Sequence, residues 1–359
     1  MSGQALPGIP QPRSQREKEA RILDIRREAE QRGRVETAGV RPAGAPFPQA
    51  SPQTGYYGIH LLKEPQWKPT IPLYFFVGGA SGSAAVIGAV CDWLGKDPDL
   101  AQDARWLAMG GAMVSSALLI EDLGTPSRFL NMLRVFKVQS PMSMGAWVLA
   151  GFGGFSTAAA FAKAVERRFG SRFPISLAGN FGQFFSALFG LPFHNYTGVL
   201  IGATAIPVWN RNIQTLPIHF GMSGLQAGVS LLELMGHRDS RALNMLGIAS
   251  TLWETWEGFH LEGRREAALQ PLKFGPSGWI TRAGGVLSGP IPLVLRLGGK
   301  RMRKWAALSG IAGSLLTRMG WVQAGKSSAR DWRLPLEIRE QGAEVREIPK
   351  ATLPAAKSA

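Results

Sequence analysis

The chain has 359 residues, of which 45% are hydrophobic and only 18% are charged, with a formal net charge of +15. Its single cysteine, Cys91, excludes a disulfide framework, an iron–sulfur cluster ligated by this chain and a multi-cysteine zinc site. Residues 1–69 carry 18 charged side chains, whereas residues 173–210 carry none. Because a helical membrane span needs about 20 consecutive apolar residues, the sequence predicts an all-α, polytopic integral membrane protein with polar tails.

The basic residues are concentrated in the tails and between the apolar segments, where anionic lipid headgroups are the nearest partners. We therefore expect contact with membrane lipid and no nucleic-acid partner. The first 69 residues contain no apolar segment of the signal-peptide type, which favours insertion directed by the first spanning helix.

The N-terminal tail, residues 1–69, contains one predicted helix. Ser14–Glu17 has the spacing of a capping box. The charged helix that follows carries a short apolar stripe, Ile22, Leu23 and Ile25. This helix either lies on the membrane surface or a partner subunit, or stays solvated. Residues 40–53, rich in Pro, Ala and Gly, predict a linker.

Eight apolar segments follow the tail, and an even number of spans places both tails on one side of the membrane. Their ranges are 70–94, 105–123, 142–162, 196–209, 213–234, 241–259, 279–297 and 305–322. Positive charge is similar on the two sides, so it does not decide the orientation.

Two connecting regions have their own predictions. Residues 175–190, between Pro174 and Pro192, predict a helix that lies on the membrane surface, and the chain from Gly325 predicts an extended tail. The predicted organisation is a tail of residues 1–69, a membrane domain of residues 70–323 and a tail of residues 324–359.

Charged groups at the ends of spans are candidates for function, because an ionisable side chain next to hydrocarbon is costly. Glu121 and Asp122 end the second apolar segment, and Arg128 and Arg134 follow. A carboxylate at a helix C-terminus faces the negative end of the helix dipole and resists ionisation unless an arginine pairs with it. The pattern predicts either a proton acceptor or a salt bridge that holds the following loop.

Further polar groups fall inside the apolar segments. Glu254 and Glu257 lie three residues apart and share a helix face, with His260 one turn further along. Glu233 ends the fifth segment and His219 lies within it, where a histidine satisfied in the core is the commoner outcome. Aromatic residues cluster before and within the first segment: Tyr56, Tyr57, His60, Trp67 and Tyr74. They fit either a membrane-interface belt or a quinone site.

Several of these segments together resemble one family. The blocks WKPTIPLYFFVGGASG at 67–82, LIEDLGTPSRFLNMLRVF at 119–136 and SPMSMGAW at 140–147 are similar to the NrfD/polysulfide-reductase membrane-subunit family. Residues 196–209 and 316–325 extend the resemblance, which covers roughly residues 56–331 and leaves out the polar N-terminal tail.

The resemblance implies eight transmembrane helices in two four-helix bundles and no redox centre in this chain. It implies an exchangeable quinone or menaquinone bound beside a ferredoxin-like subunit with four-iron clusters, which serves a molybdenum or cytochrome catalytic subunit. Such a subunit of a multisubunit respiratory oxidoreductase lies in the bacterial inner (cytoplasmic) membrane. Electrons pass between the quinone pool and the iron–sulfur partner, with proton uptake or release.

The resemblance also implies roles for particular residues. Asp122, with Glu121 and the charge partner Arg128, handles protons, and the quinone contacts Tyr74, His60, Trp67, Tyr196 and Arg134. The chain departs from the family at Thr125, where arginine is usual, and at Ala203 and Asn210. Two alternatives therefore stay open: a structural anchor for an iron–sulfur or molybdenum subunit without quinone turnover, and a transporter or proton-pathway protein.

Overall fold

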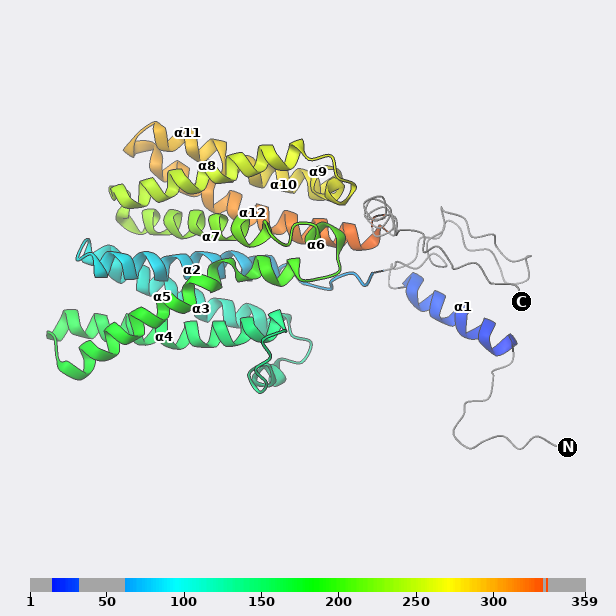
Figure 1. Ribbon diagram of the computed structural model, residues 1–359, viewed down its shortest axis with the longest axis horizontal. Helices are drawn as coiled ribbons and strands as arrows, with labels where there is room; N and C mark the ends of the chain where they lie inside the picture. Colours follow the sequence, from blue (N-terminus) through cyan, green and yellow to red (C-terminus); the bar gives the residue numbers. More distant parts are fainter. Residues whose placement is uncertain (1–14, 32–61, 332–333, 335–359) are drawn as a thin grey trace, which may run out of the picture. The chain divides into compact units, whose positions relative to one another are not determined.

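The computed structural model describes residues 15–31, 62–331 and 334, and Figure 1 shows its helices. The chain divides into one unit formed by Met1–Glu64 with Ala329–Ala359 and a second unit formed by Pro65–Ser328. In the first unit, α1 (Gln15–Gln31) confirms the predicted N-terminal helix, and its apolar stripe, Ile22, Leu23 and Ile25, is exposed. Ser14 of the predicted capping box, the predicted linker and His60 lie outside the described residues.

The first half of the second unit is a group of four helices that we call the first bundle. Its members are α2 (Thr70–Trp93), α3 (Pro98–Asp122), α4 (Pro141–Phe169) and α5 (Phe173–Gly202). α2 packs on α3 and α5, and α4 packs on α3 and α5. α3 begins seven residues before its predicted start at Arg105, because the Asp97 side chain accepts the Leu100 N–H at 3.1 Å and caps the helix.

The prediction of a surface helix over 175–190 followed by a span over 196–209 is wrong. α5 runs without a break from Phe173 to Gly202 and contains Pro192. Proline removes one helical hydrogen bond, but packing on both sides of it holds the helix together. A Cβ on Gly190 would lie 2.9 Å from the Gly82 carbonyl oxygen of α2, and Phe193 is fully buried. Tertiary packing therefore overrides the local proline signal.

The second half of this unit forms a second bundle. It consists of α7 (Leu216–Leu232), α8 (Arg241–Gly263), α10 (Gly275–Ser288), α11 (Pro290–Leu297) and α12 (Arg303–Arg330). α10 and α11 together cover the predicted seventh segment, with a break at Gly289 before Pro290. α8 packs on α7, α10 and α11, and Figure 1 shows α12 lying beside α7.

The extended tail predicted from Gly325 is wrong as far as Arg330, because α12 continues to that residue. A Cβ on Gly325 would lie 2.0 Å from the Trp209 ring, so only glycine lets the indole pack against this turn. Lys326 Nζ donates to the Trp67 carbonyl at 2.7 Å. These two contacts hold the last turns of α12 against the rest of the unit.

α7 joins the two bundles, because it packs on α2 and α5 as well as on α8. A Cβ on Gly224 of α7 would lie 3.0 Å from the Gly79 Cα of α2. The two backbones can approach this closely only because both residues are glycine. Small residues therefore serve helix packing at this crossing.

Two described helices, α2 and α4, are long and apolar enough to cross a membrane. A third candidate arises if α3 is counted with η2 (Pro126–Leu133), from which it is bent by 116°. Large apolar side chains also cover the outside of both bundles, each at least 50% exposed: Phe161, Phe184, Trp279 and Val294. This surface suits lipid better than water.

Candidate functional site

The predicted carboxylates lie at the C-terminal end of α3, where Lys68 holds them. Asp122 Oδ1 accepts the backbone N–H of Lys68, and Lys68 Nζ donates to the Glu121 carbonyl, both at 3.1 Å. Arg128 and Arg134 are exposed within and just after η2. Between these described residues there is no ion pair from Asp122 to Arg128, because the chain bends away after α3. Asp122 therefore contacts the backbone N–H of Lys68 in place of the expected Arg128 guanidinium.

The predicted aromatic residues divide between two places. Tyr74 is buried with Phe75 and Phe193 between α2 and α5. Tyr196 lies further along α5, with its ring against Gly145 of α4. Trp67 instead stacks on Trp209 with the ring centroids 5.3 Å apart. Phe75 lies between the two places, with its ring centroid 6.0 Å from that of Trp67 and 5.6 Å from that of Tyr74, whereas Arg134 is exposed after η2.

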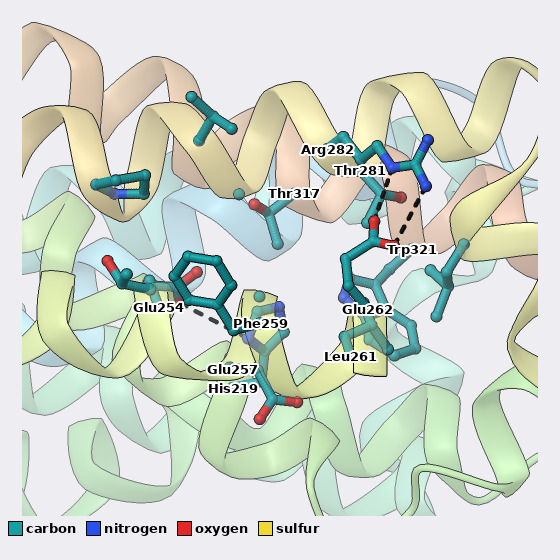
Figure 2. Close-up of a pocket in the computed structure, with 16 residues that line it drawn as sticks. His219, Glu254, Glu257, Phe259, Leu261, Glu262, Thr281, Arg282, Thr317 and Trp321 are labelled. Atoms are coloured by element: carbon teal, nitrogen blue, oxygen red, sulfur yellow. Dashed lines mark hydrogen bonds and ion pairs between the residues drawn. The ribbon is translucent and has the colours of Figure 1, made fainter. Parts of the chain in front are cut away.

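A cavity of about 180 Å³ lies inside the second bundle, between α7, α8, α10 and α12. Figure 2 shows its lining side chains converging from these four helices. One end of the cavity is formed by a half-exposed ion pair in which Arg282 Nε lies 2.7 Å from Glu262 Oε1. The other end is formed by the fully buried Glu254. The aromatic side chains Phe259 and Trp321 form part of the wall.

The polar atoms of the cavity are buried and incompletely paired. Glu254 Oε2 accepts from the Ser288 hydroxyl at 3.0 Å, while its Oε1 lies 3.8 Å from His219 Nδ1. Glu254 Oε1, both His219 ring nitrogens and Thr317 Oγ1 have no hydrogen-bond partner among the described residues. Buried polar groups are rarely left unpaired in proteins. Internal water or a bound molecule with hydrogen-bonding groups would satisfy these atoms.

Arg318 of α12 places a fixed positive charge beside this cavity. Its guanidinium donates to Ser223 Oγ and Ser314 Oγ at 2.7 Å, and to the Phe220 carbonyl at 3.0 Å. It also lies over the Phe220 ring, 5.3 Å from the centroid. These partners stabilise a fully buried cation.

A row of aromatic residues connects the predicted residue Trp67 to the cavity. The Trp209 ring, on which Trp67 stacks, donates its Nε1–H to the Trp321 carbonyl at 2.8 Å. The Trp321 ring lies 5.8 Å from the His219 ring in the cavity wall. Trp67, one of the predicted quinone contacts, is thus linked through Trp209 and Trp321 to the cavity wall.

The loop between α8 and η4 (Ala267–Leu269) carries a charged cluster outside the spanning helices. Glu266 forms ion pairs with Arg211 and Arg264. Burial works against ionisation of Glu266, but hydrogen bonds from the two arginines outweigh it and hold the pKa of this carboxyl below its ordinary value. The cluster ties the loop after α8 to the chain before α7.

Glu254, Glu257 and His219 stand out in the sequence, but their positions along the chain do not predict that they line one cavity. Nor does the sequence assign a role to Arg318 or Thr317. A usable signal was present along α7 and at the residue that follows it, where polar residues recur every three or four positions: His219, Ser223, Gln226, Ser230 and Glu233. Such a stripe within an apolar segment predicts a polar interior.

An all-helical fold with an apolar exterior and ionisable groups inside it defines a helical membrane protein. The family model described as polysulphide reductase, NrfD, matches residues 62–248, which is more than half of the chain. The chain belongs to the NrfD family, as its sequence motifs predicted. No curated protein sequence matches it. The matched range ends within α8, so Glu254 and the α12 side of the cavity lie beyond it.

Proposed function

We propose that this chain is the quinone- or quinol-interacting membrane subunit of a multisubunit respiratory oxidoreductase in the bacterial cytoplasmic membrane. Membership of the NrfD family supports the role of a membrane subunit. In this proposal the two bundles provide eight spans, with α10 and α11 counted as one. The partners are a ferredoxin-like subunit with four-iron clusters and a molybdenum or cytochrome subunit.

The observation that carries the proposal is the cavity with unpaired polar atoms at its buried end. Phe259, Val286 and Trp321 offer apolar surface to a flat ring, and the unpaired His219 and Thr317 offer hydrogen-bonding groups to a ring oxygen. A bound quinone supplies two-electron, two-proton redox chemistry. In that chemistry His219 orients a ring oxygen, and the Glu254 carboxyl holds or gives up a proton.

The carboxylate predicted at the end of α3 keeps a separate role in this proposal. Asp122, with Glu121 beside it, is a proton acceptor at the membrane edge, and Lys68 takes the place expected for Arg128. The exposed Arg128 and Arg134 are available to the iron–sulfur partner.

Binding of a fluorescent quinol-site inhibitor to the purified complex tests the cavity directly. We expect Glu254→Gln and His219→Leu each to weaken binding at least tenfold, because each removes a polar group from the buried end of the cavity. Tyr74→Phe and Asp122→Asn are the matched variants at the sequence-predicted site and should change the affinity less than twofold. The reverse pattern would move the quinone site to the first bundle.

Assay of quinone and iron in the same native preparation tests the wider function. Quinone together with iron supports the proposed subunit. Iron without quinone, and without inhibitor binding, would identify a structural anchor, and the absence of both would favour the transporter alternative.

A further inference from the structure

The second bundle contains polar side chains far beyond the cavity. Five polar side chains fall on one face of α7 and of the single π-helical turn that continues it, η3 (Glu233–His237), and none is more than 7% exposed: His219, Ser223, Gln226, Ser230 and Glu233. Each meets a polar group of the same bundle except Ser230, which faces Gly310 of α12. The buried face of α8 repeats the pattern with Gly247, Ser250 and Glu254. The interior of this bundle is thus polar along the length of α7.

Further polar side chains follow Glu254 toward the other end of the bundle. Ser250, one turn from Glu254, donates to Gln226 Oε1 and also contacts the Gly247 carbonyl at 3.0 Å. Gln226 Nε2 and Ser230 Oγ both lie within 3 Å of the point where a Cβ on Gly310 would be. Small residues therefore keep this part of the interior free of apolar side chains.

A buried ion pair lies beyond Ser230, at the end of α7. Arg296 of α11 donates to both carboxylate oxygens of Glu233, at 2.6 and 2.9 Å, and both side chains are fully buried. The Arg296 guanidinium packs directly on Gly247, which places the pair one helical turn from Ser250. At the end of the bundle, the exposed Asp239 pairs with Lys300 at 2.9 Å. We call Ser250, Gln226, Ser230, Glu233 and Arg296 the polar column.

Several atoms of the polar column have no partner in the described protein: Gln226 Nε2, Ser230 Oγ and Arg296 Nε. Buried polar atoms that lack a protein partner are usually satisfied by internal water. Hydration is therefore expected along α7 in the second bundle. Ser156 of the first bundle differs, because its hydroxyl donates to the Gly153 carbonyl of its own helix at 3.2 Å and the fully buried Phe152 lies one turn away.

We propose that the polar column is a proton pathway between Glu254 and the end of the second bundle at Asp239. The proposal rests on the proposed function, since reduction of one quinone takes up two protons and takes two electrons from the iron–sulfur partner, and quinol oxidation reverses both. Glu254 passes a proton to a ring oxygen and receives another through the hydroxyls of Ser250 and Ser230 and the water between them. Electrons do not use this route.

Accessibility of a cysteine in the polar column tests the pathway without any turnover. In a Cys91→Ser background, which removes the only cysteine, Ser230→Cys is compared with Ser156→Cys, a serine of the first bundle that is 1% exposed. Silver ion is added to the full complex in liposomes, and the thiol that remains is measured by mass spectrometry. We expect Ser230→Cys to react at least tenfold faster. Equally slow reaction of the two thiols would overturn the proposal.

A second variant tests whether the polar column limits proton-coupled chemistry. Gln226→Leu replaces the central amide with an apolar side chain of similar size, and Ser156→Ala serves as the control. We expect Gln226→Leu to slow reduction of the partner's clusters by menadiol at least tenfold, with inhibitor affinity changed less than twofold. An unchanged rate would overturn the pathway, whereas a wild-type complex that binds no inhibitor would overturn the proposed function instead.

Discussion

Arg296, Glu233 and Arg318 are charged side chains inside a protein whose outer surface is apolar. Each is retained at a site where its hydrogen-bonding capacity is largely used: the first two pair with each other, and Arg318 binds hydroxyls and a carbonyl. A buried charge without such partners would be strongly unfavourable. Loss of one partner should therefore cost far more than loss of an exposed ion pair.

Substitution of Arg296 tests this expectation. Arg296→Met leaves the Glu233 carboxylate buried without its partner, and we expect the free energy of unfolding to fall by about 3–5 kcal/mol. The control is Arg282→Met, which removes a half-exposed ion pair to Glu262 and should cost about 1 kcal/mol or less. Denaturation of the detergent-purified chain measures both. Equal losses would show that the buried pair has no special energetic role.

Glu266 links two loops through its arginine partners, and its titration affects stability. Because the folded-state pKa of this carboxyl is lowered, its contribution is fully present above its ordinary pKa of 4.5 and is lost as the pH falls through the folded-state value. Melting temperatures measured from pH 7 down to pH 3 should fall less steeply in Glu266→Gln than in the wild type. Glu121→Gln, which alters an exposed side chain, should follow the wild-type curve.

At the scale of the helix, α7 has two different faces. Its glycines Gly221, Gly224 and Gly228 face the first bundle, where they lie against α2 and α5. Its polar stripe faces the second bundle, where Glu254, Ser314 and Arg296 contact it. One helix therefore provides both the close contact between the bundles and the polar lining of one of them.

Because α7 lies so close to α2 at Gly224, we expect a larger side chain at this position to lower the stability of the protein. Gly224→Val places atoms against the Gly79 backbone, which cannot rotate away, and overpacking of this kind costs about 1–3 kcal/mol. Gly110→Val is the matched control, because a Cβ there meets nothing within 4 Å. Thermal unfolding in detergent should separate the two variants. A Gly224→Val protein as stable as Gly110→Val would contradict the tight crossing.

The helices also show which elements could be predicted. α2, α4 and α8 begin within one residue of their predicted starts, because long uncharged runs and small residues mark them clearly. α5 could not be predicted, since Pro192 is a local signal to stop and the packing that overrides it comes from α2 and α4. α12 extends beyond its prediction for the same kind of reason, namely contacts with Trp209 and Trp67.

At the scale of the molecule, polar and apolar groups are distributed in the opposite way to a water-soluble protein. Large apolar side chains cover the outside, and the second bundle encloses a histidine, carboxylates and arginines. The first bundle encloses the fully buried Phe75, Phe152 and Phe193, together with a buried cation, Arg105, which pairs with Asp92 at 2.6 Å. Both bundles therefore bury charged groups among apolar side chains.

The sequence alone determined that the chain is an all-helical membrane protein of the NrfD family, because hydropathy and sequence motifs are properties of contiguous residues. It also placed Trp67 in an aromatic cluster, and His219 and Glu254 inside apolar segments. Only the tertiary structure decided that Lys68, and not Arg128, contacts Asp122, and that polar groups of α7, α8, α11 and α12 meet in one interior. Contacts between helices depend on which faces pack together, and no local pattern along the chain contains that information.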